Sequence, residues 1–152
     1  LQVRRANGFG KLAMPCSTIG DFEIKLSALA DAIKSLHVEQ KLLLEEHKES
    51  ENHKPDRTLA RMESAIQRRF QELRRDGDEL ANVKSAIGCL REANGMRNGF
   101  QHSGGDARLL QAFAKFELQF PPSSPTKAWE RVQSKVVQSL KTLCDVVVDL
   151  SD

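Results

Sequence analysis

Apolar residues recur at three- and four-residue spacing along most of this chain, which is the periodicity of amphipathic helices. The first such segment begins at Ser17 and Thr18, both of which are suitable helix N-caps. Its apolar positions are Phe22, Leu26, Leu29, Ile33, Leu36 and Leu43. One further position of this series is occupied by polar Gln40. The pattern predicts one long helix over about residues 18–50.

Three more helices are predicted after breaks in the pattern. Pro55 suits the first turn of the second helix, whose apolar positions are Leu59, Met62, Ile66, Phe70 and Leu73. A turn at residues 76–78 precedes the third, which carries Leu80, Val83, Ile87 and Leu90. Asp106 can cap the fourth, with apolar positions Leu109, Leu110, Phe113, Phe116 and Phe120.

A proline-rich segment at 121–126 separates these helices from the last one, which is predicted over about 126–150. No segment has the pattern of a strand. The chain is therefore predicted to be all-α, an antiparallel bundle of four to five helices. Residues 17–152 form the bundle domain, and residues 1–16, which show no sustained period, are expected to be an N-terminal arm or linker.

Composition narrows the functional classes. Lys and Arg number 23 against 21 Asp and Glu, a net charge of only +2, so any RNA contact must come from local clustering. No apolar run is long enough to cross a bilayer, which excludes a membrane-spanning protein by sequence. Three widely spaced cysteines argue against a disulfide framework and favour a cytoplasmic location. Because the chain opens on Leu1, it is interpreted as a processed product or a domain of a longer protein.

Arg97 stands out because it continues an apolar series. The positions Leu80, Val83, Ile87, Leu90 and Asn94 lead to it at helical spacing. If the helix persists that far, the arginine points inward or toward a cleft, where it needs a carboxylate, a phosphate or another chain. Otherwise the helix ends at Gly95 and Arg97 turns to solvent.

His102 follows five residues later, an offset that separates two side chains by roughly 140° on a regular helix. A bend at Gly99, or a second subunit, is therefore needed to bring Arg97 and His102 together. Guanidinium holds a phosphate, and imidazole moves protons near neutral pH. Together they suit attack of a ribose 2′-hydroxyl on the neighbouring phosphate.

The stretch from Leu90 to His102 resembles the signature of the HEPN superfamily (higher eukaryote and prokaryote nucleotide-binding domains). That signature is Arg, a polar residue that is often Asn, three variable residues and His, late in a helical bundle; here it is Arg97, Asn98 and His102. The resemblance covers about residues 18–150 in architecture, but its specific part is 97–102.

This resemblance implies a metal-independent endoribonuclease with no cofactor, in which catalytic Arg97, Asn98 and His102 from two subunits line a shared cleft. It further implies RNA as substrate, a homodimer, and a toxin–antitoxin or phage-defence setting with an antitoxin or regulatory protein as partner. Some members carry a Tyr two residues after the His, where this chain has Gly104, so that form of regulation is not expected.

Further arginines are candidates for guiding RNA to the motif: Arg68, Arg69, Arg74, Arg75 and Arg91. The alternative is a solvated helix face. In related enzymes an acidic residue from an earlier helix lies near the Arg, and the sequence leaves open whether Glu63 or Glu72 does so here. No metal site is predicted, because no His has the Glu-x-x-His spacing of di-iron bundles.

Two other functions remain open. One is a non-catalytic HEPN-like module that binds a partner protein or nucleotide, favoured by the near-neutral charge and by the glycines at 95, 99, 104 and 105. The other is a helical cytokine-like signal, which the cysteines and the missing signal peptide disfavour.

Overall fold

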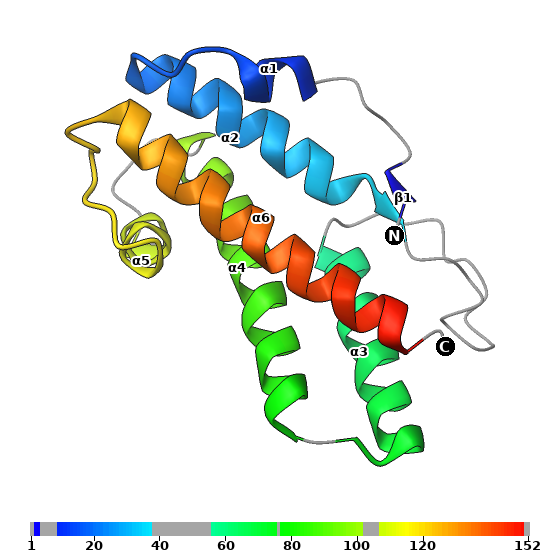
Figure 1. The fold of residues 1–152 in the computed structure, drawn as a ribbon. Helices are drawn as coiled ribbons and strands as arrows, with labels where there is room; N and C mark the ends of the chain where they lie inside the picture. Colours follow the sequence, from blue (N-terminus) through cyan, green and yellow to red (C-terminus); the bar gives the residue numbers. More distant parts are fainter. Residues whose placement is uncertain (1, 4–8, 38–55, 76, 102–106, 151–152) are drawn as a thin grey trace.

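The computed structural model describes residues 2–3, 9–37, 56–75, 77–101 and 107–150. Over these ranges the chain is a helical bundle (Figure 1), which confirms the predicted all-α class. Its helices are α1 (Phe9–Ala13), α2 (Ile19–Lys34), α3 (Asp56–Leu73), α4 (Gly77–Gln101), α5 (Ala107–Lys115) and α6 (Pro125–Asp149). Two short strands, β1 (Gln2–Val3) and β2 (Leu36–His37), pair antiparallel with Gln2 opposite His37.

Helix α4 lies at the centre of the bundle. It contacts α2, α3, α5 and α6 and therefore buries a wide arc of its surface, comprising Val83, Ala86, Ile87, Leu90, Ala93 and Met96. It forms an antiparallel hairpin with α3, whereas α2 and α6 run in the same direction as each other and cross α4 (Figure 1). The C-terminal half of α4, where the motif begins, is thus enclosed by α2, α5 and α6.

Residues 9–16, predicted as an arm, pack in part against the bundle. Lys25 of α2 is only 2% exposed, and its Nζ donates to the carbonyls of Lys11 and Leu12 at 3.3 and 2.6 Å. These carbonyls lie at the end of α1, where a cation is favourable. Cys16 is buried in the core, which raises the pKa of its thiol through desolvation, and its carbonyl accepts from Thr126 Oγ1 at 2.6 Å.

Helix α2 begins where predicted, at a capping box. The Thr18 side chain accepts from the backbone N–H of Asp21 at 3.1 Å, and Asp21 Oδ2 accepts from the N–H groups of Thr18 and Ser17 at 2.9 and 3.0 Å. These bonds satisfy backbone donors that a helix start leaves without intrahelical partners. The hydrogen bond that the Thr18 backbone N–H donates to the carboxylate, followed by the contacts with the Thr18 side chain and the Ser17 backbone, lowers the pKa of Asp21.

Asp21→Asn is expected to lower the thermal midpoint at pH 7, because the amide replaces a charged acceptor. A carboxyl with a lowered folded-state pKa stabilises the fold above its unfolded-state pKa of about 3.9 and loses that contribution as the pH falls through the folded-state value. The difference between the two proteins should therefore shrink below about pH 4 in calorimetric scans. Asp31→Asn, on an exposed position of the same helix, is the control; an equal effect there would contradict the prediction.

The predicted length of the first helix was wrong within the described part. Helix α2 ends at Lys34 with Ser35 as its C-cap, whose hydroxyl donates to the Ala32 carbonyl at 2.7 Å. The next two residues are extended because they pair with β1. The rest of the predicted helix, residues 38–50, lies outside the described ranges.

The predicted fourth helix also ends earlier, at Lys115 instead of near Phe120. Glu117 adopts a positive φ of 59°, its N–H bonds the Ala114 carbonyl, and the Leu118 N–H bonds that of Phe113. This is the Schellman arrangement that terminates helices. Helix α3 ends in the same way at Arg74, whose φ is 50°.

Candidate functional site

Arg97 lies on a helix that continues past it. Helix α4 is unbroken to Gln101, so the alternative in which it ends at Gly95 does not hold. Counting 3.6 residues per turn puts Arg97 on the same face as Leu90 and Ala93, both of which are fully buried. The side chain is half-buried, and its Nε is buried without a hydrogen-bond partner among the described residues.

Asn94 repeats this feature one turn earlier. Its Oδ1 is also buried and has no hydrogen-bond partner within the described part of the chain. Residues three apart on a helix are neighbours, so these two atoms belong to one part of α4. Buried polar atoms are nearly always paired in folded proteins, so two unpaired ones among the described residues of one helix turn make this part of α4 a candidate binding site for a ligand or partner.

Asn94 was not predicted as a site residue. The signal was present, because Asn94 occupies an apolar slot in the series that leads to Arg97. A polar residue in such a slot is either paired in the core or kept for function. The structure places it next to Arg97 in the same unsatisfied environment.

The other two motif residues are Asn98 and His102, and only Asn98 lies within the described residues. Asn98 follows Arg97 on α4 and is exposed, so it is accessible to a ligand. His102 lies outside the described residues, and so do Gly104 and Gly105. The structure therefore gives the surroundings of Arg97 and Asn98 without the geometry between Arg97 and His102.

Gly99 lies where helix α4 continues to Gln101, so of the two predicted alternatives, a bend at Gly99 or a second subunit, the described residues show no break at the glycine. It lies within α4, and a Cβ added there would come 2.7 Å from Cδ1 and 2.8 Å from Cβ of Leu109 on α5. Real Cβ atoms essentially never approach so closely, so the glycine allows α5 to pack directly on the α4 backbone. The motif glycine thus sets the distance between two helices beside Arg97.

Four of the candidate RNA-guiding arginines lie far from Arg97. Arg68, Arg69, Arg74 and Arg75 are at or near the C-terminal end of α3, where the chain turns into α4 (Figure 1). Arg97 is twenty residues beyond the start of α4, which is about 30 Å at 1.5 Å per residue. The structure therefore does not bring this group to the motif.

Arg91 is nearer, six residues and about 9 Å before Arg97 along α4. Its guanidinium pairs with Glu63 of α3 at 2.9 Å. Arg69 pairs with Glu72 at 3.1 Å, so neither of the two candidate carboxylates is shown paired with Arg97. Glu63 is the closer of the two to the motif, because α3 runs antiparallel to α4 and Glu72 lies further from the Arg97 end.

Arg75 is held by acidic residues. It forms an ion pair with Asp149 at the end of α6 and another with Glu79 at 3.7 Å. The hydrogen bond that Arg75 donates to Asp149 raises the pKa of the guanidinium further above its ordinary value. Much of the positive charge at this end of the bundle is thus neutralised within the chain.

Within the described ranges, no group of three or more His, Cys, Asp and Glu side chains is arranged to hold a metal ion. In those same ranges, none of the helices combines the length and apolar character needed to span a membrane.

Comparison with known proteins found no matching family model, no matching curated protein and no matching solved structure. The functional interpretation therefore rests on the chain's own residues, above all on Asn94, Arg97 and the motif that follows.

Proposed function

We propose that this chain is a HEPN-like, metal-independent endoribonuclease that works as a homodimer in the cytoplasm. The observation that supports this proposal is Arg97, whose Nε is buried without a hydrogen-bond partner among the described residues, on a helix face that is apolar except for Asn94. An unpaired buried guanidinium donor is unfavourable in the free protein. It becomes favourable when a phosphate oxygen accepts from it, because charge-assisted hydrogen bonds are strong where water is excluded.

In the proposed reaction, His102 takes the proton from the ribose 2′-hydroxyl, and the oxygen attacks the adjacent phosphorus. The bond to the 5′-oxygen breaks, and that oxygen receives a proton from the imidazolium of the second subunit. The products are a 2′,3′-cyclic phosphate and a 5′-hydroxyl. Arg97 stabilises the additional negative charge on the phosphorane, and exposed Asn98 orients the phosphate or the imidazole.

The biological setting follows from the motif resemblance. A free ribonuclease would damage the host cell's RNA, so an antitoxin or other regulatory protein is proposed to restrain it, as part of a toxin–antitoxin or phage-defence system. A partner that covers the C-terminal half of α4 would meet the buried donor of Arg97 and the exposed side chain of Asn98.

The test is cleavage of structured and unstructured RNA by the purified chain in EDTA, with the 2′,3′-cyclic phosphate end identified. His102→Ala should reduce the rate by about 10²- to 10⁴-fold, the usual contribution of a general acid–base residue. Arg61→Ala, at an exposed position of α3, is purified identically and should leave the rate unchanged. Equal cleavage by all three proteins would indicate a contaminant and reject the proposal.

The second candidate is a HEPN-like module that binds nucleotide or a partner protein without cleaving RNA. The ion pairs of Arg69, Arg75 and Arg91 favour it, since they leave fewer cationic groups to hold a long polyanion. Light scattering distinguishes the two candidates, because a stable monomer cannot assemble a cleft from two motifs. Nucleotide binding by a monomer that does not cleave RNA would select the module.

A further inference from the structure

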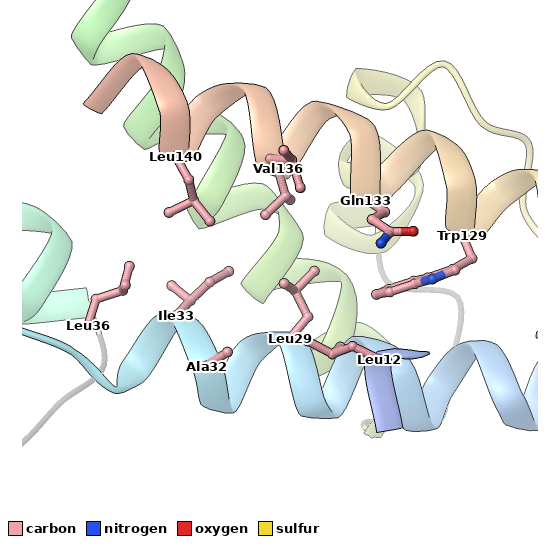
Figure 2. A pocket seen from close by; sticks show the side chains of 10 residues that line it. Leu12, Leu29, Ala32, Ile33, Leu36, Trp129, Gln133, Val136 and Leu140 are labelled. Carbon is pink, nitrogen blue, oxygen red and sulfur yellow. The ribbon is translucent and has the colours of Figure 1, made fainter. Parts of the chain in front are cut away.

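A second candidate site lies between α2 and α6, and no residue of α4 contributes to its lining. These helices run in the same direction and separate toward their C-terminal ends, so their facing side chains leave a cavity of about 210 Å³. Figure 2 shows Leu29 and Ile33 of α2 opposite Val136 and Leu140 of α6. Leu29, Ile33 and Val136 at its base are each at most 7% exposed, whereas Gln133 and Val137 at its rim are exposed, so the cavity is a groove that opens to solvent on one side.

The lining determines the chemistry of an occupant. It contains no charged side chain, and its polar groups are the indole N–H of Trp129 and the amide of Gln133, which lies at the exposed rim and points toward the gap between the helices (Figure 2). A charged group that entered the slot would lose water and find no counter-ion in the lining, which is unfavourable. A neutral apolar molecule would restore the dispersion contacts that the lining atoms lack.

The shape and size narrow the choice. Lining residues run over four residue steps of α2, from Leu29 to Ile33, and over eleven of α6, from Trp129 to Leu140, so the cavity is a slot that follows the helices for about 6–16 Å. Its volume exceeds the roughly 150 Å³ that admits benzene into an engineered cavity and is below the roughly 300 Å³ at which drug-sized pockets begin. This combination fits a short linear chain better than a compact ring system.

One wall of the slot is fixed before any ligand arrives. Trp129 closes one end of the slot, and Lys25 Nζ lies 4.9 Å from the centroid of its ring. Lys25 is itself held by the two carbonyls of α1, so the cation–π contact restricts the indole. A pre-formed pocket of this kind avoids the entropy loss of ordering its side chains on binding.

We propose that this slot is a binding site for a short, neutral, unbranched alkyl or acyl chain whose polar end hydrogen-bonds Gln133. This site is independent of the α4 motif, and its test does not depend on ribonuclease activity.

The test uses the fluorescence of Trp129, the single Trp of a chain without Tyr. The full chain is titrated with 1-hexanol, 1-octanol and 1-decanol. We expect a saturable spectral change, with affinity rising about fourfold per methylene until the chain fills the slot. Octanoate should bind at least about tenfold more weakly than 1-octanol, because no lining group pairs with its charge.

Two results would overturn the proposal at this stage. A response that does not saturate, or an affinity that keeps rising through 1-tetradecanol, would show general partitioning onto apolar surface. A response to neutral phosphatidylcholine vesicles with none to the free alcohols would assign the face to a lipid surface instead.

Two variants locate the binding. Ala32→Phe places a ring in the slot and should weaken 1-octanol binding at least about tenfold, because the slot then has no free volume. Ala81→Phe, at an exposed position of α4, is the matched control and should bind as the parent does. Equal binding by both variants, each verified as folded by circular dichroism, would place the ligand elsewhere.

Gln133→Leu keeps the slot open and serves if Ala32→Phe does not fold. The loss of one hydrogen bond should reduce the preference for 1-octanol over octane by about two- to tenfold. An unchanged preference would show that Gln133 does not bind the polar end.

Discussion

Replacing Arg97 with methionine is expected to abolish RNA cleavage and, at the same time, to make the protein more stable. Methionine is similar in length and has no donor, so the variant removes the buried Nε, which has no partner in the part of the chain that the structure describes. An unsatisfied buried donor costs about 1–3 kcal/mol. The thermal midpoint should therefore rise, by about 2–4 °C per kcal/mol in a chain of this size, while the cleavage rate falls to background.

Measuring both activity and stability distinguishes a ligand-binding role of Arg97 from a role in stabilising the fold. A residue kept for ligand binding at the expense of the fold gives lower activity and higher stability when it is replaced. If Arg97 instead supports the fold, the same change lowers the thermal midpoint, and that outcome would reject the role proposed for it. Arg61→Met, on the exposed surface of α3, should change neither quantity.

Helix beginnings could be predicted from the sequence because their signals are local. Thr18 with Asp21 forms the capping box at the start of α2, and Pro125 occupies the first turn of α6 after the Ser124 N-cap. Helix ends were harder. Leu36 continues the apolar spacing of α2, and only its pairing with β1, from a distant part of the chain, makes it a strand residue.

For the candidate site, too, the local features could be predicted from the sequence and the features set by packing could not. Arg97 followed from periodicity, because its slot in the α4 series is apolar in every earlier turn but one. The α3 arginines lie far from Arg97 because α3 and α4 are long and antiparallel. Their positions in the sequence alone do not reveal this distance. The slot between α2 and α6 depends on the angle at which they diverge, and no local pattern encodes that angle.

Gly99 has a role that the sequence did not indicate. The cluster of glycines suggested flexibility and a bend as one of two alternatives, whereas in the structure Gly99 lies within α4 and allows the close approach of Leu109. Glycine in a helix interior is intrinsically unfavourable, so its presence requires a compensating contact. For Gly99 the compensating contact is with Leu109, which lies on α5, after the motif in the sequence.

Gly99→Ala is accordingly expected to destabilise the chain by about 1–3 kcal/mol, although alanine is the better helix former, because the new Cβ would overlap Leu109. Gly95→Ala, one turn earlier on α4, meets no atom within 4 Å and should stabilise by up to about 1 kcal/mol. Urea unfolding of both variants measures the contrast between two chemically identical changes.

The double variant Gly99→Ala/Leu109→Ala tests the stated cause. Leu109→Ala alone leaves a cavity and is destabilising, but it also removes the Cδ1 and Cγ atoms that crowd position 99 and leaves only Cβ close to it. The two changes should therefore cost less together than the sum of their separate costs, since the double variant keeps one of the three close contacts. Strict additivity would show that crowding by the outer atoms of the Leu109 side chain is not the reason for glycine at position 99.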